Sequence, residues 1–457
     1  MSKVLLLNPP GDKTYLRDSY CSKVSKAAYL TPPIDLLVIS GYLHPRHQIT
    51  ALDAMAQKLS TGQALDKIRD ISPEYIISLF GQASLKNDLK FFGLLKKELS
   101  GAKLLTTGDA GFDDTEKLLK NNPCLDAVLL DYSSPDWLGY LDGQMAGIAD
   151  IAYIQNGVYT FQRSGPSKDY SIGVPRHELF SYKKYRMPFA RKLPYAGVVT
   201  DFGCPFKCDF CLIGQMPYKL RPVPEVIEEL LYLKKLGIKY FSFGDQTFGA
   251  ERERTEKLLS EMISKQINLP WGCFARADLL TEDILLSMRR AGCELLMMGV
   301  ESGDQAMLDR YHKGTELERI RRAFALCRKH GVRTVATFIL GLPGETEASF
   351  QKTMDFALEL DPDFASFNVP VAKPLTPLAA EAMSRGWVRG GEQDQSSSAN
   401  VLENETAGAR IEEWRRRSMR IFYSRPGYIL KRIKGISNLT ELKINLAEAM
   451  ALLKGQS

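Results

Sequence analysis

Two series of short apolar runs, each alternating with segments of helical spacing, set the main limit on how this chain can fold. In residues 1–150 the apolar runs are KVLLLN, QITALD, YIISLF, AKLLTT and DAVLLD, and segments such as GQALDKIRDI lie between them. Continuous apolar strands separated by helices are typical of a parallel sheet covered on both faces. We therefore predict a doubly wound, Rossmann-like α/β domain over residues 1–150, with a ligand site at the carboxyl ends of its strands.

The second series begins at YAGVVTDFG and continues in YFSF, WGCFARA, LLMMGV, TVATFIL and FASFNV. Six β/α units are too few for a complete eight-stranded barrel but suit a partial one, so we predict an open (β/α)6 barrel over residues 195–380. By analogy with complete barrels, its chemistry should lie at the carboxyl strand ends. Residues 151–194 are expected to be a linker, and residues 381–457 a polar loop followed by a basic helical region.

Charge and hydropathy limit the partners and the cellular location that can be expected for this chain. A formal net charge of +6 over 457 residues gives no argument for nucleic acid. No apolar run approaches the ~18 residues that a transmembrane helix needs, and the opening MSKVLLLNPP is not a secretory signal. We expect a cytoplasmic protein, in which clustered thiols serve metal or redox chemistry rather than disulfides.

Three of the eight cysteines fall within one short stretch, TDFGCPFKCDFCLIG, as Cys204, Cys208 and Cys211. Clustered thiolates favour zinc or an iron–sulfur centre. A closed zinc site usually takes two separated ligand pairs, and no suitable second pair lies nearby, although a distant fourth ligand stays open. A cubane cluster needs four ligands, so three thiolates would leave one iron open for a small molecule.

The stretch CPFKCDFC resembles the CxxxCxxC motif of radical S-adenosylmethionine (SAM) enzymes, with the aromatic Phe210 before the last cysteine. The resemblance implies that Cys204, Cys208 and Cys211 hold a 4Fe–4S cluster. It also implies that SAM binds the open iron and is cleaved to a 5′-deoxyadenosyl radical, which takes hydrogen from a substrate.

Other strand ends resemble the segments that contact SAM in this family. They are FSFGDQTF, ARAD, GVESGD and FILGLPGET, and the implied SAM-binding residues are Phe243, Gly244, Asp245, Arg276, Glu301, Gly341 and Gly344, together with Phe210. Simpler roles stay open: a salt bridge for Arg276, a solvated carboxylate for Glu301, and a tight turn for the two later glycines.

The amino-terminal part, KVLLLNPP…TPPIDLLVISGYL…ITALDA, resembles the cobalamin-binding subgroup of these enzymes. Ser78 and Phe80 occupy the SxL position of the familiar cobalamin pattern, and Thr107 and Gly108 occupy its glycine pair. TPPIDL stands where the pattern has its cobalt-ligating histidine, which members of this subgroup commonly lack. LLDYSSPDW replaces their usual glycine–acid stretch, so a domain that has kept the fold and lost the ligand stays open.

The resemblance implies an enzyme, most commonly one that methylates an unactivated carbon with cobalamin. The alternative is a radical cyclase or rearrangement enzyme, because FYSRPGYILKRI resembles the FYxRP stretch of anaerobic tetrapyrrole cyclases and of lipid-modifying relatives. This stretch favours a large, partly apolar small-molecule substrate over a small polar one. We also expect an electron donor such as flavodoxin or ferredoxin.

The basic tail permits a different class of function. Residues 410–434 contain nine Arg or Lys and two Glu. Such a helix can lie on an anionic membrane surface or simply pack on the barrel. A zinc-containing nucleic-acid-binding protein would explain the thiols and the tail but leaves the barrel without a purpose, so we do not expect nucleic acid as a partner.

Overall fold

The computed structural model describes residues 1–19, 22–25, 29–165, 167–187, 189–387, 410–436 and 441–443. The chain divides into two compact units, one formed by residues 1–187, 194–197 and 219–237 and the other by residues 188–193, 198–218 and 238–457. Most of the predicted polar loop, residues 388–409, lies outside the described residues.

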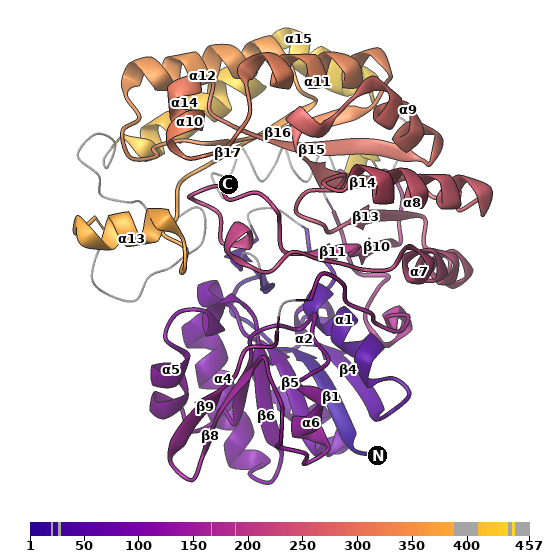
Figure 1. The fold of residues 1–457 in the computed structure, drawn as a ribbon, viewed down its shortest axis with the longest axis vertical. Coiled ribbons are helices and arrows are strands. Elements are labelled where there is room, and N and C mark those ends of the chain that lie inside the picture. The colour runs from indigo at the N-terminus through magenta and orange to yellow at the C-terminus, as the bar shows by residue number, and fades with distance from the viewer. Residues whose placement is uncertain are drawn as a thin grey trace. The chain divides into compact units, whose positions relative to one another are not determined.

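The first unit contains a seven-stranded sheet with the order β4-β1-β5-β6-β7-β8-β9 (Figure 1). The strands are β1 (Lys3–Asn8), β4 (Gln48–Asp53), β5 (Tyr75–Leu79), β6 (Lys103–Thr107), β7 (Ala127–Leu129), β8 (Ile151–Gln155) and β9 (Val158–Phe161). The five strands from β4 to β7 are parallel. Taken in chain order they follow the sequence 2-1-3-4-5, which is a doubly wound order.

Helices follow most of these strands, as the alternating pattern predicts. They are α1 (Ile34–Leu43), α2 (Ala54–Gln57), α3 (Thr61–Ile71), α4 (Leu85–Glu98), α5 (Thr115–Asn121), α6 (Leu138–Leu141) and, later in the chain, α7 (Val223–Leu236). In β1, five of six residues are buried because both faces of the strand are covered. Leu5 and Leu7 share one core with Phe91 and Phe92 of α4. Short strands β2 (Tyr15–Leu16), β3 (Lys23–Val24) and β12 (Lys219–Leu220) complete this unit.

The first residues of the predicted linker, residues 151–194, belong to the first sheet and do not form a linker. β8 and β9 form an antiparallel hairpin at the edge of the first sheet, and β8 pairs with β7. The two residues between them, Asn156 and Gly157, have φ angles of 51° and 80°. Asn-Gly is the preferred pair for a two-residue hairpin turn with positive φ, so the sequence did carry a signal for this hairpin.

The second sheet has the order β10-β13-β14-β15-β16-β17, which follows the chain (Figure 1). Its strands are β10 (Tyr195–Val198), β13 (Tyr240–Phe243), β14 (Trp271–Ala275), β15 (Cys293–Glu301), β16 (Arg333–Ile339) and β17 (Phe364–Asn368). The pairs from β13 to β17 are parallel. Each of the six predicted strands is therefore present, in an arrangement that agrees with an open six-unit barrel.

In the second unit, helices lie along the outer side of these strands (Figure 1). They are α8 (Arg252–Ser264), α9 (Glu282–Arg290), α10 (Gln305–Arg310), α11 (Leu317–Lys329), α12 (Glu347–Leu360), α14 (Ile411–Tyr423) and α15 (Pro426–Lys434). A further helix, α13 (Pro377–Ser384), stands apart from this layer in Figure 1. A capping box starts α12, because Thr346 and Ser349 satisfy each other's backbone N–H groups. α13 crosses the predicted domain boundary at residue 380.

The basic helix α14 packs on the barrel helices rather than standing alone. The ring of Trp414 stacks on Phe350 of α12 at 4.7 Å, and the Tyr423 hydroxyl donates to the carbonyl of Ala365 in β17. Of the helices in the described ranges, none combines the length and the apolar character needed to cross a bilayer.

Candidate functional site

The three clustered cysteines lie in the loop that follows β10 and the short strand β11 (Asp201–Phe202). Cys204 and Cys208 are buried, and the N–H of Cys211 donates to the carbonyl of Cys208 at 3.0 Å. Burial, with smaller contributions from Cys208 and Cys204, raises the pKa of the Cys211 thiol to about 11. The three thiols therefore lie within electrostatic range of one another.

The cysteine loop is anchored on both sides of Asp209. Its N–H donates to the carbonyl of Tyr311, and its own carbonyl accepts the N–H of Leu378 at 3.1 Å. Phe210, the aromatic of the motif, lies with its ring centroid 6.4 Å from that of Tyr311. Phe210 packs against a small core that includes Leu342. The structure thus places Phe210 in packing contacts beside the thiols.

Within the described ranges, no three His, Cys, Asp or Glu side chains form a group that could hold one metal ion. Three thiolates that each bind a different iron need not converge on one point. The donor set of three neighbouring thiols therefore fits a cluster, and coordination would deprotonate them despite their burial.

Two cations surround Cys208. The guanidinium of Arg276, which follows β14, lies 3.9 Å from the Cys208 sulfur and 4.0 Å above the ring of Phe206. Arg276 also pairs with Asp278 and donates to the carbonyl of Lys313 at 2.7 Å. Burial raises the pKa of the Cys208 thiol, and Lys313 and Arg276 oppose that rise. The predicted Arg276 is therefore at the cysteine loop.

Sequence reasoning missed Lys313, which forms a buried ion pair with the predicted Glu301. The Lys313 Nζ lies 2.8 Å from the Glu301 Oε1, and only 9% and 11% of the two side chains are exposed. Burial, the largest single effect, disfavours charge on Lys313, but Glu301 and Cys208 together outweigh it and raise the pKa of Lys313. No spacing or motif in the sequence marks this lysine, because it lies in a turn twelve residues after Glu301.

The backbone is shaped around this pair. Glu301, at the end of β15, has φ of 66°, a strained conformation for a residue with a side chain. The register with β16 shifts between Gly299 and Glu301. A Cβ at Gly299 would lie 2.2 Å from the Glu301 Oε1 and 2.8 Å from the Lys313 Nζ, so only glycine leaves room. Backbone strain beside a buried ion pair makes Glu301 and Lys313 candidates for a functional site.

The segment FSFGDQTF gives a mixed result. Phe243 is fully buried among aromatic rings, with Trp271 at 5.0 Å and Phe248 at 4.8 Å. Both oxygens of Asp245 accept hydrogen bonds from Thr200 at 2.6 Å. These two side chains therefore serve packing and backbone support. For this segment, a contact with SAM would have to come from backbone groups.

Two other residues of the segment FSFGDQTF, Gly244 and Thr247, connect it to the strand and the loop that carry the cysteines. The Gly244 N–H donates to the carbonyl of Val198 at 2.7 Å, which joins the end of β13 to the end of β10. The Thr247 hydroxyl lies 3.4 Å from the Cys204 sulfur. Thr247 thus touches a predicted cluster ligand, although no motif or spacing marks it in the sequence.

The glycines of FILGLPGET have close protein neighbours. Gly341 and Gly344 have φ of 91° and 89°. An added Cβ would lie 2.4 Å from a side-chain carbon of Ile411 at the first position, and 2.1 Å from the Arg310 guanidinium at the second. Packing against the start of α14 and the turn into α12 explains both glycines, and a contact with SAM remains a prediction.

The four predicted cobalamin residues meet at the carboxyl ends of β5 and β6, which are neighbouring strands. The Phe80 N–H donates to the carbonyl of Thr107 at 2.7 Å. Gly108 has φ of 135°, and a Cβ there would lie 2.2 Å from the Phe80 carbonyl oxygen. The Ser78 hydroxyl donates to the carbonyl of Leu7, and the Phe80 ring packs on Phe92. The backbone of Gly108 therefore provides a close-fitting edge, while the side chains of Ser78 and Phe80 already have protein partners.

A buried carboxyl lies in the first unit at the start of α1, in the segment TPPIDL. The Asp35 Oδ2 accepts hydrogen bonds from the N–H and hydroxyl of Ser19, at 3.0 and 2.7 Å. Its Oδ1 is buried and has no hydrogen-bond partner in the described part of the chain. Burial, and then nearby Asp18, raise the pKa of Asp35 to about 8. Asp35 lies in the segment that stands in place of the cobalamin histidine, and its unpaired Oδ1 could bond a ligand. The sequence analysis did not select Asp35 as a site residue.

The loop LLDYSSPDW, which replaces the glycine–acid stretch of relatives, is fixed by a buried lysine. The Lys219 Nζ lies 2.6 Å from the Asp131 Oδ2 and 3.2 Å from the Ser133 hydroxyl. The Tyr42 hydroxyl of α1 donates to the Ser133 carbonyl. Although its sequence differs from the usual glycine–acid stretch, the loop is held in place by contacts of Asp131 and Ser133.

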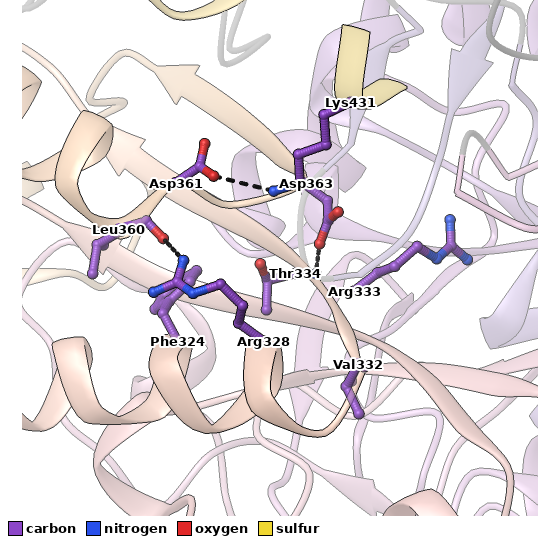
Figure 2. A pocket seen from close by; sticks show the side chains of 10 residues that line it. Phe324, Arg328, Val332, Arg333, Thr334, Leu360, Asp361, Asp363 and Lys431 are labelled. Atoms are coloured by element: carbon purple, nitrogen blue, oxygen red, sulfur yellow. Dashed lines mark hydrogen bonds and ion pairs between the residues drawn. The ribbon is translucent and has the colours of Figure 1, made fainter. Parts of the chain in front are cut away.

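A cavity of about 210 Å³ lies elsewhere in the second unit, at the amino ends of β16 and β17 (Figure 2). Two of its cations already have partners. Lys431 contacts Asp361 at 3.2 Å, and Arg328 donates to the carbonyl of Leu360. It lies at the strand edge opposite to the carboxyl ends where the cysteines follow β10, so we do not take it as the site.

Comparison with known proteins identifies the domain that carries the thiols. Residues 198–357 match the Radical SAM superfamily. The chain is 25% identical over 389 residues to an uncharacterized methyltransferase of Pyrococcus horikoshii, and the match covers 82% of each chain. It is 24% identical over 385 residues to the anaerobic magnesium-protoporphyrin IX monomethyl ester cyclase of Rubrivivax gelatinosus, covering 80% of this chain and 69% of the cyclase.

A solved structure shares the fold over most of the chain. It is the radical S-adenosylmethionine methyltransferase TsrM of Kitasatospora setae, determined with cobalamin and a [4Fe–4S] cluster bound. The TM-score is 0.66 at 18% identity, and the match covers 86% of this chain and 76% of TsrM. The match therefore includes residues from both compact units.

Proposed function

We propose that this chain, whose residues 198–357 form a radical SAM domain, is an enzyme that methylates an unactivated carbon with the help of cobalamin. The observation that carries the proposal is the loop of three neighbouring thiols bordered by Arg276, Lys313 and Glu301. When bound, the cluster would supply the electron that cleaves SAM to a 5′-deoxyadenosyl radical, and cobalamin would carry the methyl group. The cytoplasm, being reducing, suits thiols in this role.

The residues of the second unit divide the binding tasks. Cys204, Cys208 and Cys211 would each hold one iron. Lys313 and Arg276 place two positive charges beside Cys208, where the carboxylate of SAM would find charge-assisted hydrogen bonds. Glu301 compensates the buried Lys313 and offers an acceptor to the SAM amino group. Phe243, Gly244 and Asp245 support the backbone next to them.

In the first unit, Thr107 and Gly108 would form an edge of the cobalamin site, with Ser78 and Phe80 supporting it from β5. The close approach of Gly108 to Phe80 keeps side-chain atoms out of that edge. The neutral Asp35 carboxyl would donate a hydrogen bond there. Because TPPIDL offers no histidine, we expect no imidazole ligand on cobalt.

One residue beside the cysteine loop supports a substrate with an apolar part. Leu375 has φ of 65° and its side chain is 58% exposed. The left-handed conformation costs a residue with a side chain about 1–2 kcal/mol, and exposing leucine adds a further cost. Three residues later, Leu378 donates to the carbonyl of Asp209 inside the CxxxCxxC loop. A strained, exposed leucine three residues before this anchor of the cysteine loop is available to contact an apolar substrate.

Cyclisation is the second candidate, because the chain matches the magnesium-protoporphyrin cyclase over 80% of its length. The products distinguish the two reactions. If SAM methylates cobalamin, S-adenosylhomocysteine forms as well as 5′-deoxyadenosine, whereas a cyclase needs SAM only as the radical source. Either reaction requires a one-electron donor, and we propose flavodoxin or ferredoxin for this role.

The test begins with the full chain, reconstituted anaerobically with iron and sulfide. We expect a 4Fe–4S spectrum, and 5′-deoxyadenosine from SAM after reduction. Cys208→Ala should lose cleavage, while Cys124→Ala, a cysteine of the other unit, should keep it. A Cys208→Ala protein with full cluster content and full cleavage would overturn the proposal.

Two further measurements address cobalamin. Wild-type protein should retain cobalamin through gel filtration, and its Co(II) form should show no axial nitrogen splitting in paramagnetic resonance. Loaded protein should then form S-adenosylhomocysteine. Failure to retain cobalamin, with intact SAM cleavage, would exclude methyl transfer and leave the cyclase-type reaction.

A further inference from the structure

The last described helix, α15, exposes an apolar stripe. Ile429, Leu430 and Ile433 are 46%, 53% and 61% exposed. Their spacing places them on one face of the helix. On the other helices of the described ranges, large apolar side chains with comparable exposure occur singly, as Leu286 does on α9 and Ile263 on α8. The stripe is therefore unusual within this chain.

The opposite face of α15 is firmly packed, so the stripe does not arise from a loose helix. Tyr428 is buried and its hydroxyl donates to the carbonyl of Asp363 at 3.0 Å. The ring of Tyr428 meets that of Phe422 in α14 at 5.3 Å. Arg432 lies 4.1 Å above the ring of Phe364 in β17. These contacts fix which face of the helix points outward.

The charged residues of the α15 segment itself are all positive. Residues 424–436 contain Arg425, Lys431, Arg432 and Lys434 and no acidic residue. Lys431 extends from α15 to Asp361 (Figure 2), and Arg425 shares that carboxylate at 3.4 Å. Lys434 is exposed next to Ile433. Apolar side chains thus stand among cations on a helix that has no carboxylate of its own.

We propose that α15 is a peripheral docking surface for an anionic lipid bilayer. Ile429, Leu430 and Ile433 would enter the boundary between headgroups and acyl chains, and the exposed Lys434 would meet an anionic headgroup. Three side chains are far too few for a stable protein interface, which buries about 1,200–2,000 Å² in total. Aliphatic side chains also offer no stacking surface for bases. Charge and apolarity together therefore favour lipid over protein or nucleic acid.

The inference does not depend on the proposed reaction and is tested without it. Full-length protein is sedimented with vesicles of phosphatidylcholine alone or of phosphatidylcholine mixed with phosphatidylglycerol. We expect binding to the mixed vesicles, at least about tenfold weaker binding to phosphatidylcholine, and weakening as salt rises from about 0.05 to 0.5 M.

The triple variant Ile429→Ser/Leu430→Ser/Ile433→Ser should bind mixed vesicles at least about tenfold more weakly than wild type. The matched control Leu94→Ser/Leu286→Ser removes exposed leucines from two other helices and should bind as wild type does. Lys434→Glu should weaken binding to mixed vesicles and leave the weak binding to phosphatidylcholine unchanged. Circular dichroism and cluster content confirm that each variant is folded.

Several results would overturn the proposal. They are wild-type protein that ignores mixed vesicles, a triple variant that still binds them, or a control variant that loses binding equally. Two further measurements test the alternative partners of the stripe. Sedimentation equilibrium detects a dimer of this chain, and a gel shift detects binding of single-stranded RNA. If the triple variant abolishes a dimer or an RNA complex while vesicle binding is absent, the stripe serves that partner instead.

Discussion

The Lys313 Nζ lies 2.8 Å from the Glu301 Oε1, and Gly299 leaves the space that both side chains fill. Removing one member of a buried ion pair leaves the other charge uncompensated, which costs about 3–5 kcal/mol. Lys313→Met should therefore lower the free energy of unfolding by about 3 kcal/mol and weaken SAM binding. Lys313→Arg should preserve much of both.

The control is Lys352→Met, which breaks an ion pair with Asp304 in which Lys352 is 61% exposed. Exposed pairs contribute about 0–1 kcal/mol. Urea unfolding of the metal-free protein and calorimetric titration with SAM measure the two effects. Equal stability of Lys313→Met and Lys352→Met would contradict the role given to Lys313.

A glycine exchange tests the edge of the first sheet. Gly108→Ala places a Cβ 2.2 Å from the Phe80 carbonyl oxygen at φ of 135°, so we expect a loss of roughly 2–4 kcal/mol from strain and backbone movement. Cobalamin uptake should fall with it. Gly93→Ala in α4 has nothing within 4 Å and should gain about 0.5–1 kcal/mol. If both variants were more stable than wild type, or both less stable, the close approach of Gly108 to the Phe80 carbonyl would be ruled out as the cause.

Asp35 makes the stability of the protein depend on pH. Its pKa in the folded state, about 8, lies above the ordinary 3.8. Between these values the folded protein keeps a proton that the unfolded chain has released. The free energy of unfolding therefore falls as pH rises through this window, by at most about 1.4 kcal/mol per pH unit. Above about pH 8 the contribution no longer changes.

Asp35→Asn cannot ionise, so its stability relative to wild type should rise steadily from about pH 5 to about pH 8. Urea unfolding at several pH values gives this difference directly. Asp66→Asn, whose carboxylate is 67% exposed on α3, provides the control and should show little change. A constant difference between Asp35→Asn and wild type across the window would show that the carboxyl is not held neutral.

Leu375 tests whether strain is held next to the cysteine loop. Leu375→Gly relieves about 1–2 kcal/mol of left-handed strain and loses about 0.5–1 kcal/mol to unfolded-state entropy, so the variant should be equal to wild type or slightly more stable. Leu286→Gly, in the middle of α9, should lose about 1 kcal/mol. Thermal unfolding distinguishes the two, and a Leu375→Gly variant as damaged as Leu286→Gly would mean that the leucine supports the fold.

Most of the fold followed from local patterns. The runs KVLLLN, QITALD and YFSF coincide with β1, β4 and β13. In β1 and β13, nearly continuous burial leaves a strong apolar signal. The β8–β9 hairpin was missed although Asn156-Gly157 marked its turn. Its strands are partly exposed, so they lack the continuous apolar run that marks the inner strands of the sheet.

The site was less predictable than the fold. The CxxxCxxC spacing located the thiols because all three ligands are local in sequence. Lys313, Thr247 and Asp35 depend on contacts that the chain makes across distant segments, and single residues of common types carry no periodic signal. Conversely, Phe243 and Asp245 stand in the expected position but face the core and the backbone of Thr200.

The anchoring of Asp209 has a consequence for the life of the enzyme. Its N–H and carbonyl are held by Tyr311 and Leu378, so the protein fold itself orders the loop between Cys208 and Cys211. The loop therefore loses its conformational entropy when the protein folds, and not when the metal is inserted. A cluster destroyed by oxygen could be rebuilt in place on the same folded chain.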